Sequence, residues 1–366
     1  VVSGCLSQRY PDEIFEEIPE AVAVIGVNEY GALPGIIKRI TDGSPRIMRV
    51  GGEPGVLTGE RKLLTPGATA YLKVAEGCDN RCAYCAIPMI RGPYRSVPKE
   101  TLALEAARLS ASGVRELVLI AQDVSAYGSD IYGRPALAEL LDELAELASA
   151  SAPTWIRLMY CYEERVTDEL LEAIARHDNV CKYIDIPLQH ISGGVLARMS
   201  RRSTRSGIEE TLAKLRAAVP GIAIRTTFMT GFPGETEDDF SELMDFAAEQ
   251  RFERLGVFAY SPEEGTRAVD MPDQVPREVA EERRDVLMRQ QIDISLEANR
   301  RFIGRELTTL TEESEDETTF IGRTEYDAPE IDGSVIFSSP EPISPGTFAR
   351  VRITDAMDYD LVGEAV

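Results

Sequence analysis

From about Ala68 to Arg300 the sequence alternates between short apolar runs and longer amphipathic stretches. The intervening stretches, such as 102–112, 136–149 and 239–250, carry apolar residues at helical spacing. Strands that alternate with helices in this way form parallel βαβ units with right-handed crossovers. We therefore predict an α/β core of six βα units, an open or closed barrel whose chemistry lies at the C-terminal ends of its strands. The six predicted strands are 69–77, 116–122, 154–160, 181–188, 222–231 and 254–260.

Regions of different character flank this core. Residues 1–65 contain short apolar runs broken by Gly and Pro, which look like the last strands and helix of an α/β domain, with a plausible boundary at Pro66-Gly67. A long charged helix is predicted over 277–303, and the β-branched runs that follow predict a small β-barrel. We expect three parts, 1–65, 66–302 and 303–366. Because the sequence begins on what looks like a strand end, we also expect a segment upstream of Val1.

The composition excludes several classes of protein. No apolar run reaches the about 18 residues that suggest a membrane span, and no secretory signal is visible. Three of the six cysteines fall within eight residues, whereas a disulfide scaffold would be shorter and would spread them. The pattern predicts a protein of a reducing compartment, the cytoplasm.

Acidic residues dominate the charge. The chain carries 62 acids against 39 Lys and Arg, a formal net charge of −23, and residues 301–366 have fifteen acids, five Arg and no Lys. A tRNA-binding surface needs Lys and Arg to meet phosphates, whereas an acidic surface suits a basic protein, although coding bias offers a simpler origin. The run Glu312–Glu317 has five acids in six positions and is predicted to be a solvated loop.

The strongest chemical signal is the segment EGCDNRCAYCAIPMIRG, in which Cys78, Cys82 and Cys85 follow the first predicted strand. Three thiolates on one short loop can hold three irons of a 4Fe–4S cluster and leave the fourth open to a chelating substrate. A zinc site would need a fourth ligand, and the only histidines, His177 and His190, are remote in sequence. A disulfide would leave one thiol over. We therefore predict an open-iron cluster.

This triplet and its place in the chain resemble the radical S-adenosylmethionine (SAM) superfamily. The stretches VVSGCLSQRY, IAQDVSAYG, IPLQHIS, MTGFPGETEDDF and FAYSPEEGTRA extend the likeness, over nearly the whole chain, to the methylthiotransferases of that superfamily. The residues Pro187-Leu188-Gln189-His190-Ile191-Ser192 favour the branch that methylthiolates an aspartate of small-subunit ribosomal protein twelve, because tRNA-modifying relatives usually have Gln-Ser-Gly there.

The resemblance implies an architecture and a set of cofactors. The core would be a partial (β/α)6 TIM-like barrel, preceded by the remnant of an N-terminal α/β methylthiotransferase domain and followed by a TRAM domain. SAM would act as methyl donor and as radical source, and a flavodoxin or ferredoxin would supply electrons. A second 4Fe–4S cluster would use Cys5, which matches the third of three family ligands, with the other two upstream of Val1. The simpler interpretation of Cys5 is a buried cysteine at a strand end.

Further candidates come from the strand ends. The resemblance places Tyr84 near the adenine of SAM and suggests that polar groups after the strands contact SAM, and a fixed guanidinium at Arg205 would suit the SAM carboxylate. Turn and cap roles are the alternative for each, and His190 is either structural or a proton shuttle. Cys161 and Cys181 are interpreted as core residues. The full set of predicted cofactor-binding residues is Tyr84, Gln122, Asp123, Gln189, Arg205, Thr230, Gly231 and Glu235.

Two other functions compete with aspartate methylthiolation. The same chemistry on a tRNA adenosine would require a basic groove elsewhere on the surface. A non-catalytic iron–sulfur module that docks on ribosomes would form no 5′-deoxyadenosine from SAM.

Overall fold

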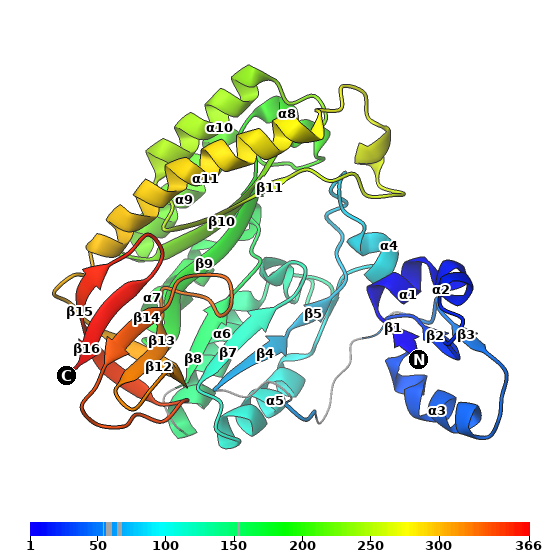
Figure 1. The fold of residues 1–366 in the computed structure, drawn as a ribbon, viewed down its shortest axis with the longest axis horizontal. Helices are drawn as coiled ribbons and strands as arrows, with labels where there is room; N and C mark the ends of the chain where they lie inside the picture. The colour runs from blue at the N-terminus through cyan, green and yellow to red at the C-terminus, as the bar shows by residue number, and fades with distance from the viewer. Residues whose placement is uncertain (54, 56–60, 64–67, 152–153) are drawn as a thin grey trace.

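A six-stranded parallel sheet forms the centre of the molecule in the computed structural model, which describes residues 1–53, 55, 61–63, 68–151 and 154–366 (Figure 1). The strand order is β11-β10-β9-β8-β7-β4, and every neighbouring pair is parallel. Because β4 and β11 end this order, the barrel is open between them, and the predicted partial (β/α)6 core is confirmed. The strands are β4 (Thr69–Lys73), β7 (Glu116–Ile120), β8 (Trp155–Leu158), β9 (Val180–Gln189), β10 (Ala223–Thr230) and β11 (Arg254–Ala259).

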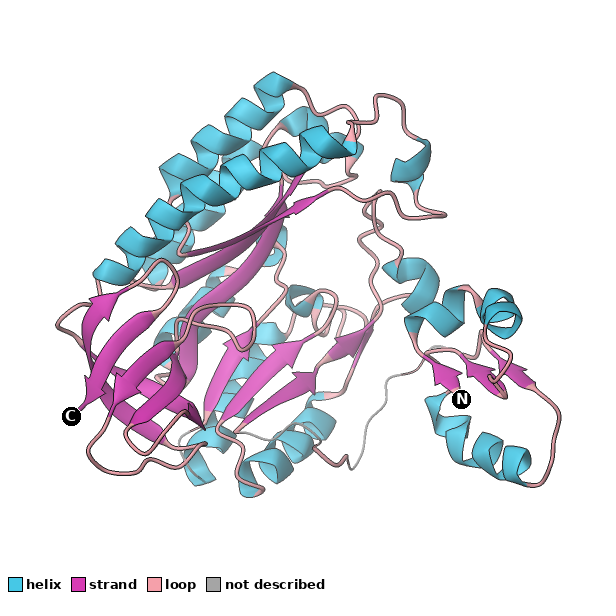
Figure 2. Ribbon diagram, in the orientation of Figure 1, coloured by secondary structure: helices cyan, strands magenta, loops and turns pink. Residues whose placement is uncertain are grey.

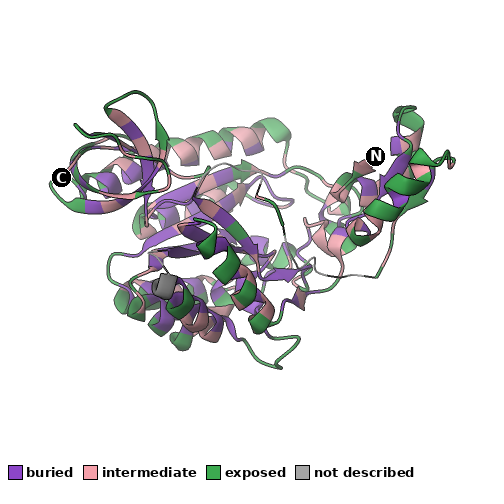
Figure 3. Ribbon diagram, turned by 90° about the horizontal axis from the view of Figure 1, so that it is seen from below, coloured by how far each residue is buried: buried purple, intermediate pink, exposed green. Residues whose placement is uncertain are grey.

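Helices cover the outer face of this sheet (Figure 2). Leu140, Leu141 and Leu144 of α6 are fully buried, as the apolar spacing of 136–149 predicts, and Figure 3 shows the buried strands behind half-exposed helices. No helix within the described ranges is both long and apolar enough to cross a membrane. The helices are α5 (Lys99–Ala111), α6 (Leu137–Ser151), α7 (Asp168–Arg176), α8 (Gly193–Arg198), α9 (Arg205–Ala218), α10 (Glu237–Gln250) and α11 (Arg277–Arg300).

The first strand is shorter than predicted. The stretch 69–77 divides into β4 and a separate β5 (Ala75–Glu76), which leaves the sheet to pair antiparallel with β6 (Arg95–Ser96). Between β5 and β6 the chain makes the cysteine loop and the short helix α4 (Ile87–Arg91). The short β5–β6 ladder thus fastens both ends of the cysteine loop to the barrel.

The N-terminal part has its own small parallel sheet, in the order β1-β2-β3. Its core is the apolar cluster of Ala23, Ile25, Ile36 and Ile47, which confirms the α/β prediction for this part. The predicted boundary at Pro66-Gly67 lies outside the described residues. The elements are β1 (Val2–Ser3), α1 (Cys5–Arg9), α2 (Pro11–Glu17), β2 (Ala23–Ile25), η1 (Tyr30–Ala32), α3 (Leu33–Thr41) and β3 (Ile47–Arg49).

The C-terminal part is a closed barrel in the order β12-β13-β14-β16-β15. Three of its strands match the predicted β-branched runs, but β12 and β16 were not predicted. The acidic run is not simply a loop: Glu312 lies in β12 and is paired with Arg323, and only the residues after Ser314 form the turn. The strands are β12 (Glu306–Ser314), β13 (Thr319–Thr324), β14 (Val335–Ser338), β15 (Phe348–Ala356) and β16 (Leu361–Ala365).

Buried ion pairs join this barrel to the sheet. Glu116, at the start of β7, has no solvent exposure and accepts hydrogen bonds from Arg157 at 2.7 Å and Arg323 at 2.5 Å. Arg254, at the start of β11, donates to Asp327 at 3.0 Å. The charged groups of these pairs are buried, so the pairs fix the orientation of the C-terminal barrel relative to the sheet. Removal of either carboxylate would leave a buried arginine without its counter-charge.

Candidate active site

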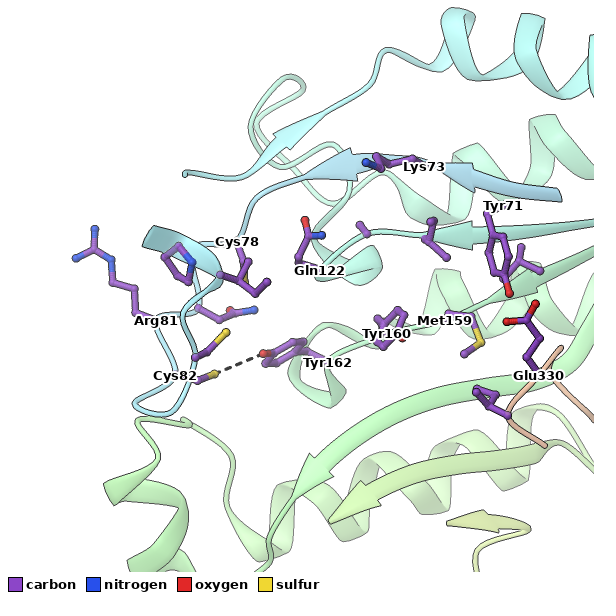
Figure 4. A pocket seen from close by; sticks show the side chains of 18 of the residues that line it. Tyr71, Lys73, Cys78, Arg81, Cys82, Gln122, Met159, Tyr160, Tyr162 and Glu330 are labelled. Carbon is purple, nitrogen blue, oxygen red and sulfur yellow. Dashed lines mark hydrogen bonds between the residues drawn. The ribbon is translucent and has the colours of Figure 1, made fainter. Parts of the chain in front are cut away.

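Cys78, Cys82 and Cys85 line one cavity of about 650 Å³ at the C-terminal ends of the strands (Figure 4). The loop that carries them begins at Gly77, whose φ of +81° few residues other than glycine adopt. A Cβ at this position would also collide with the carbonyl oxygen of Pro93. Local backbone geometry therefore requires glycine before the first cysteine.

The three cysteines are free thiols. Burial raises the pKa of Cys78 to about 11, although a backbone hydrogen bond at Asn80 opposes the effect, and burial also raises the pKa of Cys85. Three thiols on one loop are soft ligands of the kind that hold iron–sulfur clusters, and ligation would replace their protons with iron.

The arrangement fits a cluster better than a single ion. Within the described part of the chain, no group of three or more His, Cys, Asp or Glu side chains converges as the ligands of one metal ion would. In a 4Fe–4S cluster each cysteine binds a different iron, so the sulfur atoms stand around a shared space rather than around one point. Three thiols that line one cavity on a single loop meet this requirement, and the cavity is also large enough for a small-molecule ligand.

Gln122 and Asp123 hold the cysteine loop from the end of β7. Gln122 lines the cavity, and its Oε1 accepts a hydrogen bond from the Gly77 backbone N–H at 2.7 Å. The buried Asp123 carboxylate accepts from Asn80 Nδ2 at 2.8 Å and from Arg165 Nη1 at 2.6 Å. Both predicted residues thus lie at the site, where they make contacts that position its loop.

Tyr162, which follows β8, was not predicted from sequence. Its hydroxyl lies 3.5 Å from Cys82 Sγ, and the Arg201 guanidinium stands 4.5 Å from the centre of its ring. Burial and the neighbouring Cys82 raise the pKa of Tyr162, so its hydroxyl keeps its proton and can donate to the sulfur. The run CYEER (161–165), which follows the predicted strand 154–160 directly and includes an aromatic and three charged residues, was a signal that could have identified it.

Other predicted residues lie outside the lining of this cavity. Tyr84 packs edge-on against Phe232, with 6.3 Å between ring centres, in an apolar cluster behind the cysteine loop. Gln189 ends β9 in a left-handed conformation, with φ of +69°. The fully buried His190 next to it accepts a hydrogen bond at Nδ1 from the Ser192 backbone N–H, and its Nε2 lies 3.6 Å from the Glu235 carboxylate.

Thr230, Gly231 and Glu235 pack against the long helix α11. Thr230 Oγ1 donates to the Ala280 carbonyl oxygen at 2.8 Å, and a Cβ at Gly231 would collide with Ala280. Glu235 accepts from the Gly231 backbone N–H and is paired with Arg283 at 2.7 Å. In this structure the three residues therefore close the turn after β10.

Arg205 is not placed to bind the SAM carboxylate. It is the first residue of α9 on the outer helical layer and does not line the cavity. Its guanidinium is already paired with three carboxylates, Glu209, Glu242 and Glu249. Each of its three nitrogen atoms donates to one of these carboxylates, so in this structure the guanidinium points into the outer layer, which does not favour a contact with SAM in the cavity.

Cys5 lies where the N-terminal part meets the barrel. It is the first residue of α1 and half-buried, and α1 contacts α4, which follows the cysteine loop. Arg91 of α4 donates to Cys5 Sγ at 3.3 Å and to Glu76 of β5 at 2.7 Å. One arginine therefore links Cys5 to the strand that leads into the loop.

Comparisons with known proteins agree with this geometry. The radical SAM superfamily matches residues 72–247, and the TRAM domain matches 303–366. The chain is 46% identical to a protein of Desulforamulus reducens named ribosomal protein uS12 methylthiotransferase RimO, and the alignment covers 100% of this chain and 82% of that protein. Proteins of the same name are 48% identical in Desulforudis audaxviator, with 99% of this chain and 80% of the relative covered, and 45% identical in Geobacter sulfurreducens, with 100% and 82% covered.

The open barrel and its cysteine loop are thus those of a radical SAM enzyme, with a TRAM domain as its C-terminal barrel. Such an enzyme takes a 4Fe–4S cluster and SAM. Identity at this level over the whole chain assigns it more closely. The chain belongs to the RimO family of methylthiotransferases and is a transferase.

Proposed function

We propose that this enzyme adds a methylthio group to the β-carbon of an aspartate in small-subunit ribosomal protein uS12. The observation that carries the proposal is 46% identity, over the full chain, to relatives named for modification of uS12. A tRNA adenosine, the substrate of the alternative, is disfavoured by the charge of the TRAM domain. Ten of its fifteen acids are exposed, and such a surface repels phosphates and attracts a basic protein.

Cys78, Cys82 and Cys85 would hold the cluster that binds SAM. When bound, the cluster supplies the electron that cleaves SAM, and the fragment released removes a hydrogen atom from the substrate carbon. The residues of the chain prepare the site for this step: Gln122 fixes the start of the loop, and the Tyr162 hydroxyl faces Cys82. Hydrogen bonds to a ligand sulfur are one way in which a protein tunes a cluster potential.

Five finer assignments belong to the same proposal. Cys5 would ligate a second 4Fe–4S cluster with cysteines expected upstream of Val1, and Arg91, within 3.3 Å of its sulfur, would orient it. A flavodoxin or ferredoxin would supply electrons, and the enzyme would work in the cytoplasm. The domains would divide at 65/66 and 302/303. The remaining candidates Tyr84, Asp123, Gln189, Thr230, Gly231 and Glu235 would support the SAM site from behind its lining.

The test is a competition between the two substrate classes. The chain, with any upstream segment restored, is reconstituted anaerobically with iron and sulfide and given SAM, a reductant, uS12 and tRNA together. Mass spectrometry of both products should show a methylthio group on a uS12 aspartate and none on tRNA. Modification of tRNA alone would refute the substrate assignment. Failure to form 5′-deoxyadenosine would instead favour a non-catalytic iron–sulfur module.

A further inference from the structure

The TRAM domain forms part of the wall of the active-site cavity. The tip of its β13–β14 loop (residues 325–334), Pro329-Glu330-Ile331, lines the same cavity as the cysteines. Figure 4 shows Glu330 beside Tyr71 and Met159, at the end of the cavity that lies opposite Cys78 and Cys82. No sequence pattern in the barrel indicates this contribution, because the loop lies more than 240 residues after the cysteines.

The base of this loop is held firmly. Asp327 is buried and paired with Arg254 of β11, and the neighbouring Ala328 has no solvent exposure. On the other side of the tip, Asp332 accepts from the Tyr183 hydroxyl at 2.7 Å and lies 3.5 Å from the Arg225 guanidinium. The tip therefore stands at a fixed place relative to the strands of the radical SAM barrel.

Glu330 has two features that packing does not explain. Its φ is +68°, a left-handed conformation that residues other than Gly, Asn and Asp rarely adopt, yet a glutamate occupies it. Its carboxylate is exposed, and among the residues that the structure describes no side chain forms an ion pair or hydrogen bond with it. Strained backbone at a cavity wall commonly marks a residue kept for function.

The surroundings of Glu330 leave it available to a cation. The nearby lining from Val118, Met159 and Ile331 is apolar, and the cavity lysine, Lys73, is already paired with Glu76 at 2.7 Å. A cation that reaches this end of the cavity would meet an exposed carboxylate beside Tyr71 that forms no ion pair among the described residues. It could form a charge-assisted hydrogen bond to Glu330 while its apolar stem packs on the apolar lining.

We propose that Glu330 is a specificity-determining residue that binds a Lys or Arg side chain of the polypeptide substrate near the residue to be modified. This inference rests on the proposed function, because it requires a basic protein as substrate. The other cation that could reach the cavity is the sulfonium of SAM, and the experiment must separate the two sources.

The test compares Glu330→Gln with Glu317→Gln, which removes the same charge from an exposed position in the β12–β13 turn of the same domain. Binding of fluorescent uS12 is measured by anisotropy on the full chain without reconstitution, at several salt concentrations. We expect Glu330→Gln to raise Kd about tenfold and to flatten the salt dependence, as loss of one charged hydrogen bond does. Glu317→Gln should change Kd less than twofold.

Turnover on the reconstituted enzyme provides the second arm. Glu330→Gln should raise KM for uS12 and leave the KM for SAM, and 5′-deoxyadenosine formation without uS12, unchanged. Equal effects of the two substitutions on uS12 binding would overturn the inference, as would a raised KM for SAM alone. If the wild-type enzyme modifies tRNA and not uS12, the proposed function fails and this inference fails with it; if wild type modifies uS12 and Glu330→Gln behaves like it, only the inference fails.

Discussion

The buried carboxylate of Glu116 should contribute several kcal/mol to the stability of the contact between the barrel and the TRAM domain. Burial by itself would raise the pKa of this group, but the Arg157 and Arg323 guanidinium groups that face it lower the pKa to about 2. Compared with the ordinary value of 4.5, this corresponds to about 3 kcal/mol at neutral pH. Glu116→Gln keeps the shape of the side chain but removes the counter-charge of the buried Arg157 and leaves Arg323 paired with Glu312 alone, which independently suggests about 3–5 kcal/mol.

Urea denaturation followed by fluorescence gives the free energy of unfolding for wild type and variant. Trp155, next to Phe348 of the TRAM domain at 4.7 Å between ring centres, reports on this interface directly. The matched control is Glu306→Gln, because Glu306 pairs with Arg350 and Arg352 at the surface, where such pairs contribute about 0–1 kcal/mol. Equal losses in the two variants would refute the reasoning.

The pH dependence checks the same prediction. Because the pKa of Glu116 is lower in the folded state, its stabilising effect is complete above about pH 4.5 and disappears as the pH falls towards 2. The difference between wild type and Glu116→Gln should therefore shrink by about half at pH 3 relative to pH 7. A constant difference over this range would mean that the variant acts through packing and not through charge.

Three further outcomes are expected. Gly77→Ala places an alanine at a positive φ, where its Cβ would collide with the Pro93 carbonyl oxygen. The iron and sulfide content after reconstitution should therefore fall severalfold, and the melting temperature should fall by several degrees. Cys82→Ala should abolish the 4Fe–4S absorbance of this loop and 5′-deoxyadenosine formation, whereas Cys181→Ala, a change in the apolar cluster between the sheet and the TRAM barrel, should keep both. Arg205→Ala should change the KM for SAM less than twofold, and a tenfold rise would restore Arg205 to the SAM site.

Much of the fold was predictable because local patterns and tertiary structure agree. The strands β7 and β8 are buried along nearly their whole length and appear as apolar runs, and the helices between the strands show clear amphipathic spacing. The predictions failed where the tertiary structure differs from what the local sequence pattern indicates. Residues 69–77 were predicted as one strand, yet the strand breaks at Val74 because β5 pairs with β6, and the choice of a pairing partner is not visible in a local stretch of sequence. In the TRAM barrel, β12 was missed because its sequence, ELTTLTEES, is mostly Thr and Glu. Two of its three Thr residues are nevertheless buried in the structure.

The candidate site divides in the same way. The cysteines could be found from spacing alone, and Gln122 and Asp123 from their place after a strand, since strand ends meet at one edge of a parallel sheet. Arg205 was proposed from residue type alone, which says nothing about whether neighbouring acids already pair with a guanidinium, as they do here. Glu330 could not be found, because its position depends on how a separate domain folds back onto the barrel.

The ion pairs beneath the β13–β14 loop also limit how this enzyme can be rebuilt. Three ion pairs cross this contact: the TRAM residues Arg323, Asp327 and Asp332 pair with Glu116, Arg254 and Arg225 of the radical SAM barrel, respectively. Each of these charges therefore has an opposite charge on the other domain. A chimera that joins this TRAM domain to another radical SAM barrel would bury Asp327 and Asp332 without their arginine partners and leave Arg323 paired with Glu312 alone, unless the three barrel residues are transferred as well. Exchange of substrate-binding domains among such enzymes therefore has to involve the strand starts of the recipient barrel as well as the domain that is moved.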